Sequence, residues 1–225
     1  KRGLKFINIP TTTLSMIDSS IGGKNALNIG ETKNAIGTIY PPENVLIGFD
    51  VLKTLDERNF NNGLFEAIKT GLILSEYIFN IFIDNKEKEN ISELITLCIK
   101  EKIKIVKLDE DEKNIRKILN FGHTFGHAIE LLPNYDLLHG EAIANGMLIV
   151  SKNETYHNVL LSIIQRLGCQ IIGNIEADKV IDLIKNDKKI ESNKIKLIKV
   201  HKVGQATIED YDINKLKEEL INYGF

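Results

Sequence analysis

Residues 116–127 read RKILNFGHTFGH, and this stretch carries the clearest structural signal in the chain. Residues three or four apart share one face of an α-helix, so polar groups at these steps predict a helix with a polar stripe. The groups that follow this spacing are Arg116, Asn120, His123 and His127. We expect one helix over residues 118–132, with Gly122 and Gly126 inside it. Each glycine costs about 1 kcal/mol relative to alanine, so the helix suggests a place where a ligand or another backbone comes close. An exposed polar face with two ordinary histidines is the alternative.

Upstream of this stretch, two short apolar runs predict buried strands. They are Leu4–Ile9, which Pro10 ends, and Asn44–Phe49. Two strands make only a piece of an α/β sheet, too small to be stable alone. From about residue 56 the apolar spacing becomes helical, and we expect further helices over residues 62–74, 91–99, 139–150 and 214–223, with a strand over residues 194–200.

The fold class that follows is an α/β N-terminal piece and a mainly α-helical domain. We place the first over residues 1–56 and the second over residues 57–225. The chain begins at Lys1 without a methionine and runs directly into a strand-like segment, so we expect the start of the protein to be missing.

Composition excludes several classes of partner. The net charge of -2 gives no field that would hold nucleic acid or an anionic membrane. No apolar run reaches about 18 residues, so no membrane span is expected. The two cysteines, in apolar surroundings, fit a reducing cytosol, and no signal peptide is visible. We therefore expect a cytoplasmic protein.

The residue types also allow a metal site. A carboxylate with two neutral imidazoles, and one coordination position left open, is a ligand set of catalytic zinc. Glu66, His123 and His139 could supply it, but the spacing matches no short zinc motif. From chemistry alone this grouping is a guess, because a lone glutamate on a helix is usually just solvated.

A glycine-rich loop adds a weaker signal. Gly22-Gly23-Lys24 could present backbone N–H groups and an ammonium to an anion. It is not a Walker A loop, because Asp18 and Asn25 stand where that motif needs glycine and Ser or Thr. Most such loops are simple turns.

Taken in order, these segments resemble the 3-dehydroquinate synthase family. The resemblance covers about residues 2–150 and weakens afterwards, with NDKK at residues 186–189 as a late anchor. It rests on PTTTLSMIDSSIGGKNALN, KNAIGTIYPP, LKTLDER, GLFEAIK, KIKIVKLDEDEKNIRKILNFGHTFGHAIE and LLHGEAIANGM. The GHTFGHAIE and HGEA blocks are specific to sugar-phosphate cyclases.

The resemblance implies a role for each matching residue. The metal ligands, for Zn²⁺ or alternatively Co²⁺, would be Glu66, His123 and His139. NAD would contact Asp18, Lys33 and Thr54. The substrate pocket would hold Lys24, Asn34, Lys69, Lys102, Arg116, Asn120 and His127, with Lys188 or Lys189 as a further basic contact. Of these, the catalytic residues would be His127, Lys69, Asn120, Arg116 and Lys102.

The family reaction is the conversion of the sugar acid phosphate DAHP to 3-dehydroquinate, in the shikimate pathway that leads to chorismate and the aromatic amino acids. NAD⁺ accepts a hydride from the C5 hydroxyl, phosphate is eliminated, the hydride returns, and an aldol step closes the ring. The resemblance also implies a homodimer. It does not extend to a glycine-rich turn for the NAD pyrophosphate, which this sequence lacks.

Three rival hypotheses remain open at this stage. The first is another sugar-phosphate cyclase, which would make an inosose or a valiolone. The second is a polyol dehydrogenase, which would form NADH without releasing phosphate. The third is a fragment that folds but does not turn over.

Overall fold

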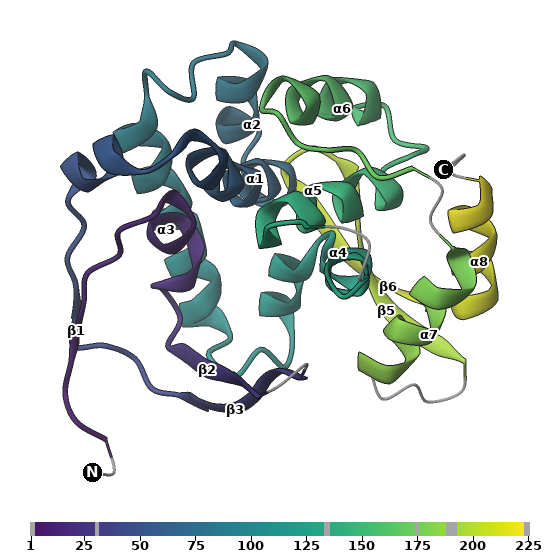
Figure 1. Cartoon of the computed structure of the whole chain (residues 1–225), viewed down its shortest axis with the longest axis horizontal. Helices are drawn as coiled ribbons and strands as arrows, with labels where there is room; N and C mark the ends of the chain where they lie inside the picture. The colour runs from purple at the N-terminus through teal and green to yellow at the C-terminus, as the bar shows by residue number, and fades with distance from the viewer. Residues whose placement is uncertain (1–2, 30–31, 133–135, 174–175, 188–192, 223–225) are drawn as a thin grey trace.

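The computed structural model describes residues 3–29, 32–132, 136–173, 176–187 and 193–222, and most of them lie in helices (Figure 1). The α-helices are α1 Glu57–Leu74, α2 Glu76–Ile83, α3 Ile91–Leu108, α4 His123–Glu130, α5 His139–Val150, α6 His157–Arg166, α7 Ala177–Asp187 and α8 Ile213–Asn222. Short turns of other helix types are the π-helix η1 Ser15–Ser19 and the 3-10 helices η2 Phe49–Thr54 and η3 Ile115–Asn120. The mainly α-helical part of the predicted fold class is confirmed.

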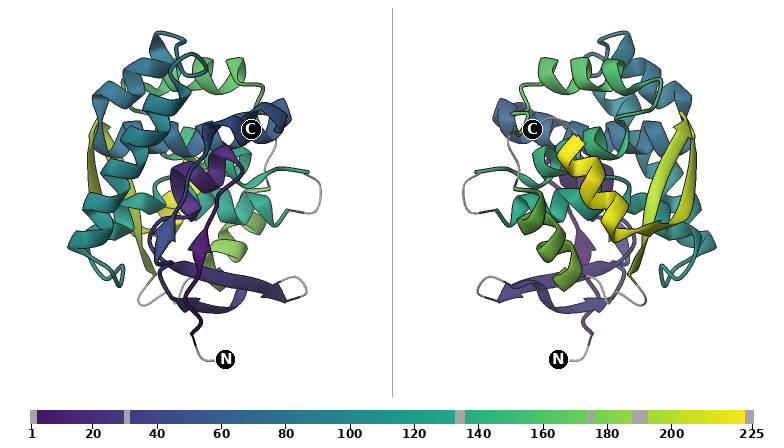
Figure 2. Two further views of the ribbon diagram at one scale, coloured as in Figure 1. Left: turned by 90° about the vertical axis from the view of Figure 1, so that its left-hand side faces the viewer. Right: turned by 90° about the vertical axis from the view of Figure 1, so that its right-hand side faces the viewer.

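The described strands form three separate two-stranded sheets. β1 Ile7–Asn8 pairs in parallel with β4 Asn44–Val45. β2 Lys24–Ile29 and β3 Thr32–Ile39 form an antiparallel hairpin, as do β5 Lys194–Lys202 and β6 Gln205–Asp212. The two strands expected at residues 4–9 and 44–49 are therefore present only as two-residue strands. The prediction that they are buried was wrong, because Leu4, Ile7 and Leu46 are exposed. The β2–β3 hairpin was not predicted. Figure 2 shows this purple hairpin beyond the end of the helices in both views.

Helix α1 lies at the centre of the helical body (Figure 1). It begins after Asp56, whose carboxylate accepts a hydrogen bond of 3.0 Å from the N–H of Asn59. The predicted apolar stripe Leu64, Ile68 and Leu72 is 0% exposed. Because α1 is covered by other elements over most of its length, polar groups on it are also removed from water. No helix in the described part of the chain is long and apolar enough to cross a membrane.

The prediction of a single helix over residues 118–132 was wrong. The chain instead forms η3, breaks at Phe121 and Gly122, and starts again as α4. Gly122 has a φ of +77°, a left-handed conformation that ends one helix and that side chains other than glycine rarely adopt. Arg116 and Asn120 thus do not share a helix face with His123 and His127.

Glycines bring α4 and α5 into close contact. A Cβ on Gly126 would lie 3.0 Å from the Cα of Ile143, and one on Gly122 would lie 2.9 Å from the Ile143 carbonyl oxygen. From the other side, a Cβ on Gly146 would overlap the Gly122 carbonyl oxygen and lie 2.8 Å from the Gly126 nitrogen. The expected close approach therefore involves another backbone, that of α5.

We predict that Gly146→Ala destabilises the protein by about 1 to 3 kcal/mol, because the new methyl group meets backbone atoms that cannot move aside. Urea unfolding measures the change. Gly48→Ala is the matched control, since nothing lies within 4 Å of a Cβ there. Equal stabilities for the two variants would contradict the packing described.

His201 on β5 joins the last hairpin to the turn between α5 and α6. Its Nδ1 lies 2.9 Å from Glu154 Oε1 in that turn, and its Nε2 lies 2.9 Å from Glu209 Oε1 on β6. The hydrogen bond with Glu209 raises the pKa of His201; burial opposes the rise, but the contacts with Glu209 and Glu154 together outweigh it. An imidazole that donates from both nitrogens is protonated, so the contact is strongest with charged His201.

The stability that His201 contributes should depend on pH. Since its pKa is raised in the folded state, the contribution is complete below the unfolded value of about 6.5 and is lost as pH rises through the folded pKa. We predict that the stability difference between the natural chain and His201→Gln shrinks from about pH 5.5 to 9. Denaturant unfolding across this range tests it, and a difference that grows with pH would refute it.

Candidate metal centre and anion pocket

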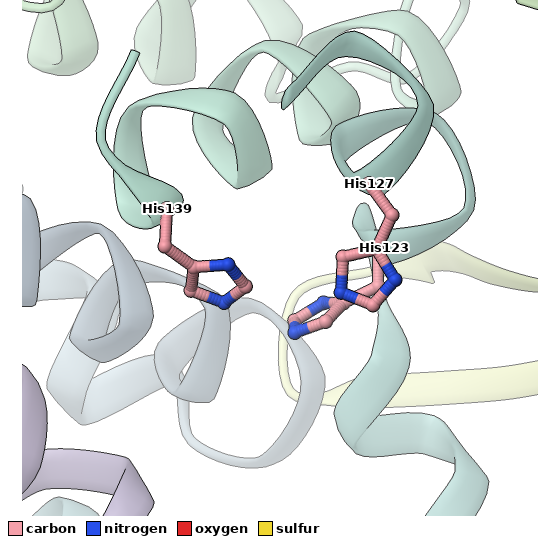
Figure 3. A group of neighbouring side chains, drawn as sticks. All are labelled: His123, His127 and His139. Atoms are coloured by element: carbon pink, nitrogen blue, oxygen red, sulfur yellow. The ribbon is translucent and has the colours of Figure 1, made fainter. Parts of the chain in front are cut away.

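Three histidines face a common space beside α1. His123 and His127 extend from α4 and His139 from the first residue of α5 (Figure 3). A nitrogen from each ring lies within 4.8 Å of the others, and the ring centroids are 5.2 to 5.8 Å apart. The break at Gly122 places α4 so that its histidines meet the start of α5.

Glu66 reaches the same space from the middle of α1. Its Oε1 lies 3.7 Å from His139 Nε2 and 3.9 Å from His123 Nε2. Both carboxylate oxygens are buried without a hydrogen bond of acceptable geometry, although the Lys69 ammonium contacts Oε2. Lys69 pairs with Oε2, whereas Oε1 faces Nε2 of both imidazoles. One carboxylate oxygen and two imidazole nitrogens form a donor set that fits a divalent cation.

In His123 and His139, the outer nitrogen, Nδ1, contacts a protein oxygen, so that Nε2 of each ring faces Glu66. His123 Nδ1 lies 3.1 Å from the Phe121 carbonyl oxygen, and His139 Nδ1 lies 3.3 Å from Glu130 Oε2. Such partners of the second ring nitrogen are typical of metal-binding histidines. Burial, Lys69 and the other two histidines hold the pKa of His123 well below its usual value, so this ring is neutral at pH 7. For His139, burial lowers the pKa, but the contacts with Glu130 and Glu66 outweigh it and raise the pKa.

Buried cations lie next to this centre. Lys69 is 2% and Lys102 is 8% exposed, and Lys102 Nζ lies 2.7 Å from Asp18 Oδ1 on η1. Burial raises the pKa of Asp18, but Lys102 and Lys69 outweigh it and lower the pKa well below the usual range. Burial lowers the pKa of Lys102, and Asp18 only partly opposes this. The structure thus brings a residue expected at NAD into contact with one expected at the substrate.

Arg116 packs under the glycine-rich loop. Its Nη2 donates to the Gly22 carbonyl oxygen at 3.0 Å and its Nη1 to that of Glu110 at 2.6 Å. Gly22 has a φ of +100°, and a Cβ there would overlap Nη2 of Arg116. Here glycine is required because the loop turns in a left-handed conformation against a buried guanidinium.

Glu112 is a residue of this cluster of charged side chains that the sequence analysis missed. Its Oε2 forms an ion pair with Lys24, and its Oε1 accepts a hydrogen bond of 2.6 Å from Asn120. Glu112 therefore links Lys24 and Asn120, two residues expected to contact the substrate, through its two carboxylate oxygens. Its sequence signal was weak, because it lies in an acidic run that also reads as a solvated turn.

Among the remaining expected site residues, Thr54 is the one whose side chain the structure describes, and it does not join this group. Thr54 is exposed at the end of η2, where its hydroxyl donates to the Val51 carbonyl oxygen. The side chains of Lys33 and Asn34 on β3, and the whole of Lys188 and Lys189, lie outside the residues that the structure describes.

Comparison with known proteins identifies the family. A model of the 3-dehydroquinate synthase N-terminal region matches residues 1–62, and one of the 3-dehydroquinate synthase C-terminal region matches residues 63–190. The chain is 43% identical to the 3-dehydroquinate synthase of Picrophilus torridus, over 93% of this chain and 64% of that protein. It is 39% identical to that of Dictyoglomus turgidum, over 99% of this chain and 68% of that protein.

The chain belongs to the 3-dehydroquinate synthase family. It spans about two thirds of the length of the relatives that it matches in this family.

Solved structures have the same fold. A 2-epi-5-epi-valiolone synthase from Streptomyces hygroscopicus, with NAD⁺ and Zn²⁺ bound, superposes with a TM-score of 0.87 at 23% identity, over 99% of this chain and 67% of that one. A 2-deoxy-scyllo-inosose synthase, in complex with carbaglucose-6-phosphate, NAD⁺ and Co²⁺, gives a TM-score of 0.83 at 27% identity, over 100% of this chain and 68% of that one. This fold therefore occurs in structures that hold a dinucleotide and a divalent metal.

We predict that Asp18→Ala destabilises the protein by about 2 to 3 kcal/mol, because it leaves Lys102 buried near Lys69 without a carboxylate partner. Asp50→Ala is the control, since its ion pair with Lys53 is exposed and such pairs contribute little to stability. Urea unfolding of both variants makes the comparison. A smaller loss for Asp18→Ala than for Asp50→Ala would contradict this electrostatic account.

Proposed function

We propose that this chain is the metal- and substrate-binding part of a 3-dehydroquinate synthase, which converts DAHP to 3-dehydroquinate and releases phosphate. The observation that carries the proposal is the meeting of Glu66, His123 and His139 beside buried Lys69 and Lys102. These groups come from α1, α3, α4 and α5, far apart in sequence, within a chain of this family. A metal centre next to buried cations suits a substrate with a hydroxyl near a phosphate and a carboxylate.

Two sets of ligands compete for the cation in this space. His123, His127 and His139 could hold it alone, since their nitrogens lie close together. We favour Glu66 with His123 and His139, because Glu66 Oε1 is buried without a hydrogen bond and lies 3.9 Å and 3.7 Å from Nε2 of His123 and His139. The contacts of Phe121 and Glu130 with the outer nitrogens support the same set.

A zinc or cobalt ion bound there would act as a Lewis acid and lower the pKa of a substrate hydroxyl. His127, whose ring centroid is 5.2 Å from that of His123, would relay the proton. Lys69, Lys102 and Arg116 would bind the anionic groups. Lys24 and Asn120, which both contact Glu112, would complete the substrate pocket from the side of η3.

The N-terminal segment supports an NAD-binding role for the complete enzyme. We propose that residues 1–56 are the remnant of a Rossmann-like domain whose Asp18, Lys33 and Thr54 contact NAD, and that residues 57–225 form the second domain. Several apolar side chains of residues 1–56 are exposed to an unusual degree. They are Leu4 at 67%, Ile9 at 61%, Leu27 at 69% and Ile36 at 61%. We infer that the part of the relatives that this chain does not span covers these side chains, and that the enzyme is a cytoplasmic homodimer.

The direct test joins this chain to the remaining third of the Picrophilus torridus relative and supplies DAHP, NAD⁺ and Zn²⁺. We expect phosphate release that a chelator abolishes and that His123→Ala eliminates together with metal binding. His201→Gln is the matched control, since this histidine lies on the surface away from the site and should leave turnover unchanged. Absence of phosphate, or release that survives both chelator and His123→Ala, would refute the proposal.

The same assay separates the rival functions. Phosphate release from a sugar phosphate without the carboxylate, and none from DAHP, would indicate another cyclase. Net NADH formation without phosphate would indicate a polyol dehydrogenase.

A further inference from the structure

Helix α1 carries a second set of polar side chains on the face that bears Glu66. Arg58, Asn62 and Glu66 follow one another at steps of four residues, so they lie one above another along the helix. Glu66 reaches the histidines, whereas Arg58 and Asn62 reach the first turn of α5. That turn begins with His139.

Arg58 forms a two-pronged ion pair with Glu141 of α5. Its Nε lies 2.8 Å from Oε1 and its Nη2 lies 2.8 Å from Oε2. Glu141 is only 5% exposed, and its Oε2 also accepts a hydrogen bond of 2.8 Å from the N–H of Leu138. Arg58 thus acts through Glu141 on the residue that precedes His139.

Asn62 holds the residue on the other side. Its Oδ1 accepts a hydrogen bond of 2.7 Å from the N–H of Gly140, and Asn62 is 5% exposed. A Cβ on Gly140 would overlap the Asn62 carbonyl oxygen, so the two helices touch through their backbones at this point. The N–H of Gly140 is therefore bonded directly to α1, and the N–H of Leu138 is linked to α1 through Glu141 and Arg58.

We propose that Arg58 and Asn62 are positioning residues that fix the His139 imidazole relative to Glu66, so that one helix sets both sides of the metal site. The inference rests on the proposed function, because it assumes that His139 binds the cation. Neither residue contacts the cation itself. Their effect reaches it through Glu141 and the backbone on either side of His139.

The experiment measures the Co²⁺ and Zn²⁺ dissociation constants of the whole chain by competition with a chelator, together with the cobalt absorption spectrum. Arg58→Gln and Asn62→Ala should each raise the dissociation constants about 10- to 100-fold, as loss of a supporting partner does at other metal sites, and alter the cobalt spectrum. Lys88→Gln is the matched control, because Lys88 also pairs with the start of α1, at Glu57, but lies on the surface. It should leave the affinity unchanged.

The His139→Ala background separates positioning from general stability. There, Arg58→Gln should weaken metal binding no further, since the ligand that it positions is gone. Equal weakening with and without His139, or full affinity of both Arg58→Gln and Asn62→Ala, would overturn the inference. If His139→Ala itself left the affinity unchanged, the proposed metal set would be the part that fails. Thermal unfolding of the metal-free variants verifies that each is folded at the assay temperature.

Discussion

A buried carboxylate in the middle of the central helix is the constraint on which the rest of this structure depends. Glu66 is 0% exposed, and its charge must be balanced inside the protein. Lys69 contacts one oxygen from the same helix, and the Nε2 atoms of His123 and His139 face the other. The positions of α4 and α5 can be understood as the means by which these imidazoles reach a carboxylate on α1.

Backbone contacts make that arrangement possible. Gly122, Gly126 and Gly146 allow α4 and α5 to approach until main-chain atoms touch, and Gly140 does the same for α5 and α1. Larger residues at these positions would separate the helices and widen the space between the polar groups. The glycines are therefore part of the site even though they offer no side chain to a ligand.

The sequence predicted the parts of the fold that follow from local periodicity. The stripe of α1, the extent of α5 and the strand β5 have strong apolar patterns and were confirmed. The break at Gly122 was missed because the steps between Arg116 and His127 fit a helix, and only contact with α5 requires the left-handed turn. The β2–β3 hairpin was missed because its polar sequence reads as a loop. Glu112, Glu130 and Arg58 were missed as site residues for a related reason, since each acts through a partner that is distant or weakly marked in sequence.

The central claim is that one divalent cation is held by Glu66, His123 and His139. The most direct measurement is an anomalous difference map, at the zinc absorption edge, from crystals grown with Zn²⁺. The account predicts one strong peak about 2.0 to 2.2 Å from a Glu66 oxygen and from Nε2 of both histidines, with His127 farther away. A peak coordinated by the three imidazoles with Glu66 outside bonding distance, or no peak between these helices, would contradict it.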